Sequence, residues 1–252
     1  MNTRDRVKAT ATSFEVLEAL IEADGAGVTE CAERVDLSKS SAYSHLATLE
    51  ELGYVVEEGG TYRVGMGFLD LGHRAREGNT LYRNAVPEIQ KLAYASGLPS
   101  SVLVAERGVG IPLKTVPGNK TEEIVCETGV ETPLHATAAG KAILAELDHE
   151  EVEGIADRQG LEQATPNTID DTADLFDELR TIRDQGLAYD REEYREGFRG
   201  VGAAVTDPRD RVVGAVTVMG PVDLLSGKRF QQDIPGLIIS TTNRIGNRVA
   251  SP

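Results

Sequence analysis

Short hydroxyl side chains gather on one side of a predicted helix that runs from Lys39 to about Leu52. On a helical wheel, Ser40, Ser44 and Thr48 lie opposite the apolar positions. Short polar side chains allow a helix to approach the floor of a DNA major groove and to hydrogen-bond with base edges. The chemistry that they suit is contact with double-stranded DNA, and we assign to it Lys39, Ser40, Ser41, Tyr43, Ser44, Thr48 and Arg63.

Two predicted helices and a hairpin must hold this face in place. Thr29 is a candidate cap for a first helix that ends near Asp36, and Ser38 caps the second helix. The second helix ends at Gly53, a residue suited to a left-handed C-terminal position. Its apolar stripe consists of Ala42, Leu46, Leu49 and Leu52.

The hairpin is the feature that favours a winged helix-turn-helix over a solvated helical hairpin of an all-α protein. Its predicted strands, 54–56 and 61–64, flank Glu57-Glu58-Gly59-Gly60, and Arg63 is placed to contact a phosphate. A further helix is predicted upstream, from Thr12 or Ser13 to about Asp24, with Thr12 and Glu15 as a capping box. It is expected to bury Phe14, Leu17, Leu20 and Ile21.

Length and composition bound the remaining choices. A chain of 252 residues, 40% of them hydrophobic, is long enough for two domains. The sequence has no apolar run of about eighteen residues and no secretory signal at its start, so we expect a cytoplasmic protein with no membrane partner. Cys31 and Cys126 stand far apart and away from other ligands, so neither a disulfide nor a metal or other cofactor is predicted.

The net charge of −15 is the reverse of what a DNA-binding protein usually shows. One explanation is a salt-rich, halophilic cytoplasm, in which strong screening makes the self-repulsion tolerable. Operator binding would then depend only weakly on potassium chloride. The alternative is an ordinary acidic protein whose basic groups are concentrated at the DNA face, namely Arg4, Arg6, Lys8, Arg34, Lys39 and Arg63.

Three segments are expected: a winged helix-turn-helix domain (1–65), a linker helix (66–78) and a second domain (79–252). The linker helix carries Met66, Leu69, Leu71 and Phe68 towards one side, which suits subunit contact, and the alternative is a plain linker. The second domain begins with a helix over 80–96, and strands and helices then follow in an order that predicts an α+β fold with an antiparallel sheet. We expect its strands at 101–106, 110–116, 188–193, 201–207 and 212–219, and its other helices at 138–147, 149–158, 171–185 and 226–249.

Small residues lead into one of these helices through the segment PLHATAAGK, residues 133–141. Thr137 is a plausible cap, and the small side chains leave the first backbone N–H groups of the helix open. Such a helix terminus attracts carboxylates through its free donors and its dipole. The alternative is a plain capped helix that is packed tightly on the sheet.

Over nearly its full length the chain resembles the IclR-type transcriptional regulators. The resemblance rests on SKSSAYSHLATLEELGY with TYRVG and LDLG, on PLHATAAGKAILA, on YDREEYREGFRGVGAAVTD and on VVGAVTVMGP. It implies a winged helix domain that pairs with its twin, a linker helix, and a C-terminal effector domain of GAF-like topology that often assembles into dimers of dimers. It also implies no catalysis.

The resemblance further implies that an effector, commonly a small organic acid, lies between the loop before the predicted helix at 138–147 and the sheet. The corresponding residues here are Thr137, Ala138, Ala139, Asp190, Phe198, Gly200, Gly202, Thr217 and Met219. Gly200 stands where many members have cysteine, which removes a side chain from the pocket wall, so a larger effector or a different mode of binding is expected. Ser44 stands where many members have arginine, so one expected DNA contact is absent.

Two other functions stay open at this point. An enzyme could use His135, Asp190, Glu192 and Glu193 for acid–base chemistry, but the sequence has no nucleophile elbow, metal-ligand set or phosphate loop. A DNA-binding protein whose C-terminal domain only oligomerises is the other alternative. Stabilisation by a small molecule would separate a sensing domain from a purely structural one.

Overall fold

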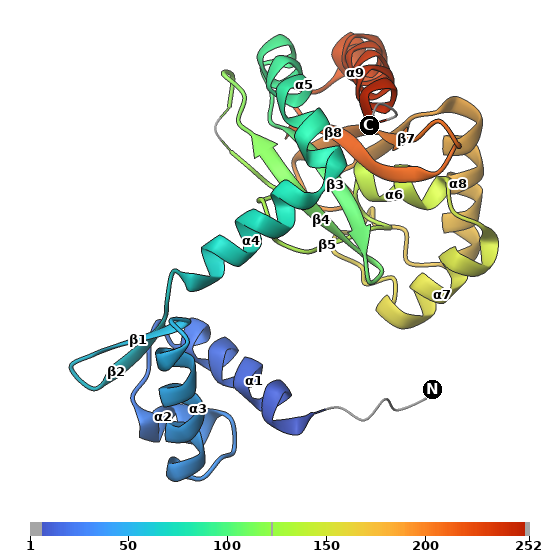
Figure 1. Ribbon diagram of the computed structural model, residues 1–252. Coiled ribbons are helices and arrows are strands. Elements are labelled where there is room, and N and C mark those ends of the chain that lie inside the picture. Colours follow the sequence, from blue (N-terminus) through green and yellow to red (C-terminus); the bar gives the residue numbers. More distant parts are fainter. Residues whose placement is uncertain (1–6, 122, 250–252) are drawn as a thin grey trace. The chain divides into compact units, whose positions relative to one another are not determined.

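The computed structural model describes residues 7–121 and 123–249 of the chain (Figure 1). The chain divides into two compact units at the Gly78–Asn79 bond, which we call the N-terminal unit and the C-terminal unit. Each unit is described by itself. Among the described residues, no helix combines the length and the apolar character that a membrane crossing requires.

The N-terminal unit is a helical domain with a β-hairpin. Its elements are α1 (Lys8–Glu22), α2 (Val28–Arg34), α3 (Lys39–Glu51), β1 (Val55–Glu58), β2 (Thr61–Val64) and α4 (Gly67–Gly78). Both residues of the hairpin turn, Gly59 and Gly60, have positive φ angles of 62° and 85°. This is the conformation of a tight two-residue turn whose twist matches that of the strands. The order of elements confirms the winged helix-turn-helix.

The first helix differs from the prediction in its start and in its buried side. It begins at Lys8 and has no side-chain cap, because the chain already turns helical before Thr12. Leu17 and Leu20 pack into the core with Val16, whereas Phe14 and Ile21 are 58% and 66% exposed. The spacing of apolar residues correctly predicts an amphipathic helix. However, two of these apolar residues, Phe14 and Ile21, lie outside the face that packs on the core.

The other N-terminal elements differ from the prediction only at their ends. The cap of α2 is the backbone of Gly27 rather than the side chain of Thr29. The Ser38 side chain caps α3, as predicted. Leu52 is not part of the buried stripe: it lies at the C-cap and is 63% exposed. Gly53 follows with a φ of 81° and turns the chain into the hairpin.

One antiparallel sheet organises the C-terminal unit, with the strand order β5-β4-β3-β8-β7-β6 among the described residues. The strands are β3 (Ser100–Glu106), β4 (Val109–Val116), β5 (Thr132–Pro133), β6 (Ala188–Arg191), β7 (Phe198–Thr206) and β8 (Val212–Pro221). The antiparallel α+β fold is therefore confirmed. The short strand β5 is not among the predicted strands, because two residues carry no periodic signal.

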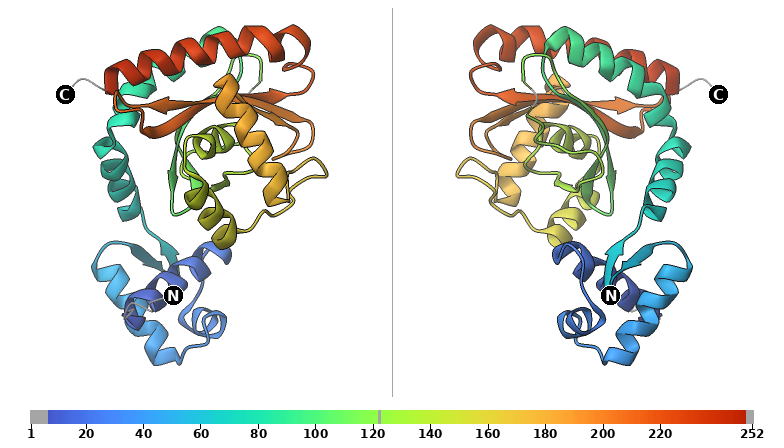
Figure 2. Two further views of the ribbon diagram at one scale, coloured as in Figure 1. Left: turned by 90° about the vertical axis from the view of Figure 1, so that its right-hand side faces the viewer. Right: turned by 90° about the vertical axis from the view of Figure 1, so that its left-hand side faces the viewer.

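Helices cover both faces of this sheet (Figure 2). They are α5 (Thr80–Ser96), α6 (Ala138–Ala145), α7 (His149–Gln159), α8 (Thr172–Gln185) and α9 (Ile234–Val249), which follows a π-helical turn (Arg229–Asp233). On β7, Val201, Ala203 and Val205 belong to the core under α5 and α9. Because side chains alternate along a strand, Gly200 and Gly202 are turned to the opposite face, where α6 packs.

Candidate functional sites

The recognition-helix candidate α3 presents the predicted face to solvent. Ala42 and Leu46 are fully buried in the N-terminal core and fix the rotation of the helix. Ser40, Tyr43 and Ser44 are exposed on the opposite side. The structure therefore places the predicted DNA face on an accessible surface of the N-terminal unit.

The hydroxyl groups of this face are partly engaged within the helix. Ser44 Oγ donates to the carbonyl of Ser40 at 2.9 Å, and Thr48 Oγ1 donates to the carbonyl of Ser44 at 2.7 Å. Each oxygen keeps lone pairs that can accept a hydrogen bond. In this conformation these two side chains are acceptors, whereas Lys39 supplies an ammonium donor.

The remaining DNA candidates are spread around this face. Lys39 is exposed at the first turn of α3, Ser41 is half-buried beside it, and Arg63 is exposed on β2. The Arg63 stem lies over the turn after α1: a Cβ atom on Gly25, where φ is 101°, would lie 2.8 Å from its Cγ. Gly25 therefore makes room for Arg63. Arg4 and Arg6 lie outside the described residues.

The wing tip carries negative rather than positive charge. Glu57 and Glu58 are exposed on β1, and the Glu57 carboxylate accepts a hydrogen bond from the backbone N–H of Gly60. This contact holds the carboxylate against the two-glycine turn. A wing of this charge repels the phosphates that a basic wing would attract.

The predicted effector residues of the sheet are neighbours across three strands. Asp190 on β6 pairs with Gly200 on β7, and Gly200 pairs with Met219 on β8. Thr217 lies opposite Gly202 two residues further along the same two strands. The structure thus brings together residues that are up to 29 positions apart in the sequence, as the resemblance implied.

The N-terminus of α6 approaches this part of the sheet closely. A Cβ atom on Gly202 would lie 2.9 Å from the carbonyl carbon of Ala138 and 2.9 Å from the nitrogen of Ala139. A Cβ atom on Gly200 would lie 3.5 Å from the Ala138 Cβ and 3.3 Å from the Asp190 Cβ. The two glycines therefore allow the helix terminus to lie directly on β7.

Two amide donors at this helix terminus are unused. Thr137 caps α6 as predicted, because its Oγ1 accepts from the N–H of Gly140 and its carbonyl accepts from the N–H of Lys141. Among the described residues, the N–H groups of Ala138 and Ala139 have no acceptor. Free amides at a helix N-terminus favour an anion.

Asp190 adds an unsatisfied carboxyl oxygen to the same site. The side chain is fully buried, and its Oδ1 accepts from the N–H groups of Glu193 at 2.7 Å and Tyr194 at 3.3 Å. Its Oδ2 has no hydrogen-bond partner within the described structure. Burial raises the pKa of Asp190 to about 7, and the Glu193 carboxylate also acts to raise it. The carboxyl can therefore carry a proton near neutral pH.

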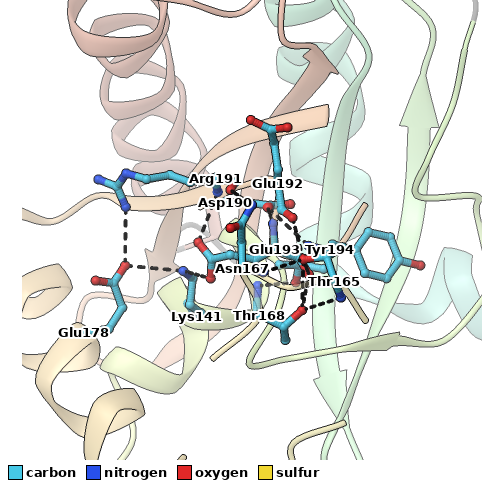
Figure 3. Close-up of polar contacts among 12 residues, drawn as sticks. Lys141, Thr165, Asn167, Thr168, Glu178, Asp190, Arg191, Glu192, Glu193 and Tyr194 are labelled. Atoms are coloured by element: carbon cyan, nitrogen blue, oxygen red, sulfur yellow. Dashed lines mark hydrogen bonds and ion pairs between the residues drawn. The ribbon is translucent and has the colours of Figure 1, made fainter. Parts of the chain in front are cut away.

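A buried ion pair that the sequence patterns do not predict lies beside Asp190 (Figure 3). The ammonium of Lys141 is fully buried, 2.5 Å from Glu193 Oε2 and 3.3 Å from Glu178 Oε1. Glu193 Oε1 also accepts from the backbone N–H of Arg191. These contacts fix the loop after β6 to α6. The signal in the sequence is the single charged residue in the apolar run AAGKAILA.

Neighbouring side chains occupy the space beside Gly200, and the size of the effector stays a prediction. Met219 Cγ lies 3.2 Å from the place where a Cβ atom of Gly200 would stand. Met219 itself packs against Cys126, with the two sulfur atoms 3.3 Å apart. The space that glycine leaves is filled, because the flexible methionine side chain follows the available volume.

Three of the predicted effector residues have structural roles. Thr217 Oγ1 donates to the carbonyl of Val201, and Thr137 Oγ1 donates to that of Pro133. Phe198 is buried, and the Arg195 guanidinium lies 4.6 Å from its ring centroid. Within the described part of the chain, the unused polar groups of the site are therefore the amides of Ala138 and Ala139 and the Oδ2 oxygen of Asp190.

Family models match most of the chain. The model described as bacterial transcriptional regulator IclR C-terminal matches residues 74–246, and the IclR helix-turn-helix domain matches residues 11–59. A probable HTH-type transcriptional regulator ArcR of Halobacterium salinarum is 32% identical over 97% of this chain and 94% of its own length. The HTH-type transcriptional regulator KdgR of Escherichia coli is 30% identical over 90% of this chain and 88% of its own length.

Solved structures share the fold. The Thermotoga maritima IclR superposes with a TM-score of 0.80 at 24% identity, covering 97% of this chain and 99% of its own. An IclR homolog from Microbacterium hydrocarbonoxydans, complexed with 4-hydroxybenzoate, superposes with a TM-score of 0.82 at 17% identity, covering 96% of this chain and 98% of its own. At these identities the likeness establishes the fold alone.

Proposed function

Because this chain belongs to the IclR family of transcriptional regulators, which are DNA-binding proteins rather than enzymes, we propose that a small organic acid regulates its binding to operator DNA. The enzyme alternative is therefore dropped. The observation that carries the effector proposal is the buried, unpartnered Oδ2 of Asp190 beside the free amides of α6.

For the DNA side, we infer that the first two turns of α3 enter the major groove. Lys39 and Arg63 supply phosphate contacts, while the oxygens of Ser40 and Ser44 accept from base amino groups. Ser41, Tyr43 and Thr48 complete the proposed interface. Because the proton of Ser44 is engaged within α3, the Ser44 side chain selects bases that offer donors, namely the amino groups of adenine and cytosine.

For the effector side, we infer that the ligand carboxylate accepts hydrogen bonds from the amides of Ala138 and Ala139. Asp190 in its protonated form donates from Oδ2 to the same ligand, so two acids can share the site without repulsion. The 4-hydroxybenzoate bound by the Microbacterium homolog is an organic acid, which supports this class of effector. Gly200, Gly202 and Met219 shape the wall.

We also infer that two copies of the N-terminal unit pair. A groove of about 490 Å³ in this unit is lined by Phe14 of α1, Leu52 at the end of α3 and Leu71 of α4, each of which is largely exposed. Contiguous exposed apolar side chains of this kind are typical of subunit interfaces. The domain roles are accordingly DNA binding for 1–65, pairing through the linker helix for 66–78, and effector binding with further assembly into dimers of dimers for 79–252.

The mechanism is thermodynamic linkage between the two functions. An effector that favours one arrangement of the paired DNA-binding domains changes operator affinity, and the operator changes effector affinity by the same factor. Couplings of this kind amount to about 1 to 3 kcal/mol.

The test uses Asp190→Ala and a panel of sugar acids, 2-oxo acids and aromatic acids that includes 4-hydroxybenzoate. In the wild-type protein one of these acids should raise the melting temperature and change operator affinity in footprinting upstream of the protein's own gene. In the variant both effects of the acid should be lost, while operator binding without the acid is unchanged. If no acid stabilises the wild-type protein, the C-terminal domain only oligomerises. Equal loss of operator binding in the absence of acid would indicate a misfolded variant and contradict the assigned role.

A further inference from the structure

The C-terminal unit contains a cavity that none of the proposed effector residues lines. Its volume is about 220 Å³. Leu144 of α6, Val152 of α7 and Leu175 of α8 form its fully buried walls, and Leu134 closes it from the segment before α6. The half-buried Leu161 lies on a further side.

Both the size and the character of this cavity point to a small ring. Protein interiors are close-packed, and voids larger than a water molecule are few. An apolar cavity of about 150 Å³ is sufficient to hold benzene. A space of about 220 Å³ therefore accommodates one six-membered ring with one or two small substituents.

One polar group that lines the cavity has unused capacity. His135 is 5% exposed, and its Nε2 lies 3.1 Å from the carbonyl oxygen of Glu162. Because a carbonyl can only accept, Nε2 must carry the proton, and in the neutral ring Nδ1 is left as an acceptor. None of the hydrogen bonds among the described residues uses Nδ1. Burial lowers the pKa of His135, which favours this neutral form.

Two other polar side chains of the lining already donate hydrogen bonds to backbone carbonyls. Thr132 Oγ1 donates to the carbonyl of Gly110, and Gln159 Nε2 donates to that of Arg107. Glu131, which is paired with Arg107, and Glu162 are exposed on the rim, and no lysine or arginine lines the space among the described residues. A ligand inside the space therefore meets the free Nδ1 acceptor of the buried His135 and apolar walls.

We propose that this cavity is a second small-molecule site, separate from the effector site, which takes a neutral six-membered-ring compound with one hydroxyl group, such as a phenol. The ring fills the space between Leu134, Leu144 and Leu175, and the hydroxyl donates to Nδ1 of His135. The proposal does not depend on the identity of the effector, because it concerns other residues and an uncharged ligand.

The experiment titrates the full-length protein with three matched probes, which are 4-fluorophenol, fluorobenzene and 4-fluorobenzoate. Fluorine NMR measures the binding of each probe. We expect 4-fluorophenol to bind roughly threefold to tenfold more tightly than fluorobenzene, which is the effect of one neutral hydrogen bond. The benzoate should not compete with 4-fluorophenol, because the described lining holds no cation. Competition by the benzoate would overturn the assignment of the ligand class.

Two kinds of variant locate the site. Ala156→Leu fills the cavity from α7 and Leu161→Trp fills it from the opposite segment, so each should abolish binding of both neutral probes while the protein keeps its cooperative thermal unfolding. His135→Phe keeps a ring but removes the acceptor, so the two neutral probes should bind equally. Asp190→Asn, in the effector site, should leave 4-fluorophenol binding unchanged.

The opposite results overturn the proposal. It fails if the wild-type protein binds neither neutral probe, or if 4-fluorophenol binding survives both filling variants. Loss of 4-fluorophenol binding in Asp190→Asn with retention in Ala156→Leu would place the phenol in the effector site instead. That result would leave the proposed function intact and remove this second site.

Discussion

Asp190 combines features that make it the most informative single residue of the chain. It is fully buried, one of its carboxyl oxygens has two amide donors, and the other has none within the described structure. Its nearest charged neighbours are Glu193 and Lys141, which already pair with each other at 2.5 Å. A negative charge on Asp190 is therefore poorly compensated, and folding favours the protonated form of its side chain.

The proton on Asp190 predicts a specific dependence of stability on pH. Because the pKa of Asp190 is raised from its ordinary value near 4 to about 7, the folded state binds the proton more tightly than the unfolded state. The wild-type protein should lose roughly 3 to 4 kcal/mol of unfolding free energy relative to Asp190→Asn as pH rises from about 4 through 7 to about 8, and nothing further above that. Denaturant unfolding of both proteins across this range measures it. A constant difference between them would show that Asp190 is ionised in the folded state.

A second prediction at this scale concerns Ser40. Ser40→Glu places a carboxylate on the exposed face of α3, where it would meet phosphates and base acceptors, so operator binding should fall by at least about a hundredfold. The domain should keep its melting temperature, because the side chain is exposed. Thr181→Glu adds the same charge on exposed α8 and serves as the control in the same mobility-shift assay. Equal losses in the two variants would mean that overall charge, and not the α3 face, determines the effect.

At the scale of elements, the contact between α6 and β7 depends on Gly202. Adding a methyl group there would bring a carbon atom within 2.9 Å of the backbone of Ala138 and Ala139, and backbone atoms cannot move aside as a side-chain end can. Gly202→Ala should therefore cost about 1 to 3 kcal/mol of stability and weaken the effector response.

Gly236→Ala is the matched control for this prediction. Gly236 lies in α9, and apart from its own helix backbone no described atom lies within 4 Å of the place where the added methyl group would stand, so the substitution should stabilise the helix by about 0.5 to 1 kcal/mol. Thermal unfolding of the two variants compares them directly. A neutral Gly202→Ala would show that α6 can move away from the sheet without cost.

Glu88 holds two helices together and predicts the behaviour in acid. Its fully buried carboxylate accepts from Lys91 at 2.8 Å on its own helix, and from Arg244 at 2.6 Å and Arg248 at 3.0 Å on α9. The hydrogen bond from Lys91, with that from Arg244, lowers the pKa of Glu88 to about 2. The resulting stability is present above about pH 4.5 and is lost as pH falls towards 2.

Glu88→Gln should therefore reduce the unfolding free energy by about 2 to 3 kcal/mol at pH 7, and the difference from wild type should vanish near pH 2. Substitution of the exposed Glu153 by glutamine is the control and should have no comparable effect. Chemical denaturation at several pH values gives both differences. A difference that persists unchanged to pH 2 would place the destabilisation in packing and not in charge.

The elements that could be predicted from the sequence are those with local causes. Ser38 and Thr137 cap their helices because the capping oxygen and its N–H partner are three residues apart. The start of α1 carries no capping pattern in the sequence, because that helix has no side-chain cap. The strand β5 carries no local pattern either, because only its pairing with β4 defines it. The Lys141–Glu193 pair joins residues 52 positions apart, and no local pattern names the partner.

At the scale of the whole molecule, the net charge of −15 must be reconciled with binding to a polyanion. The described structure places negative charge even on the wing, at Glu57 and Glu58, and offers few cations on the α3 face besides Lys39. Association cannot rely on releasing many counterions from the DNA, because few phosphates can be neutralised. Concentrated salt screens the repulsion, since the Debye length falls to about 3 Å at 1 M.

Operator affinity should therefore change by less than about tenfold between roughly 0.3 and 2 M potassium chloride, or it should rise with salt. A protein that neutralises several phosphates instead loses orders of magnitude in DNA affinity over a comparable range of salt. Replacing Glu57 and Glu58 together by lysine supplies the missing counterion release, so this variant should bind more tightly in dilute salt and lose affinity steeply as salt increases. Fluorescence anisotropy with operator and unrelated DNA, for both proteins, gives the two slopes. A steep loss in the wild-type protein would mean that its few cations are gathered on the DNA after all, and the acidic wing would then be held away from the phosphates in the complex.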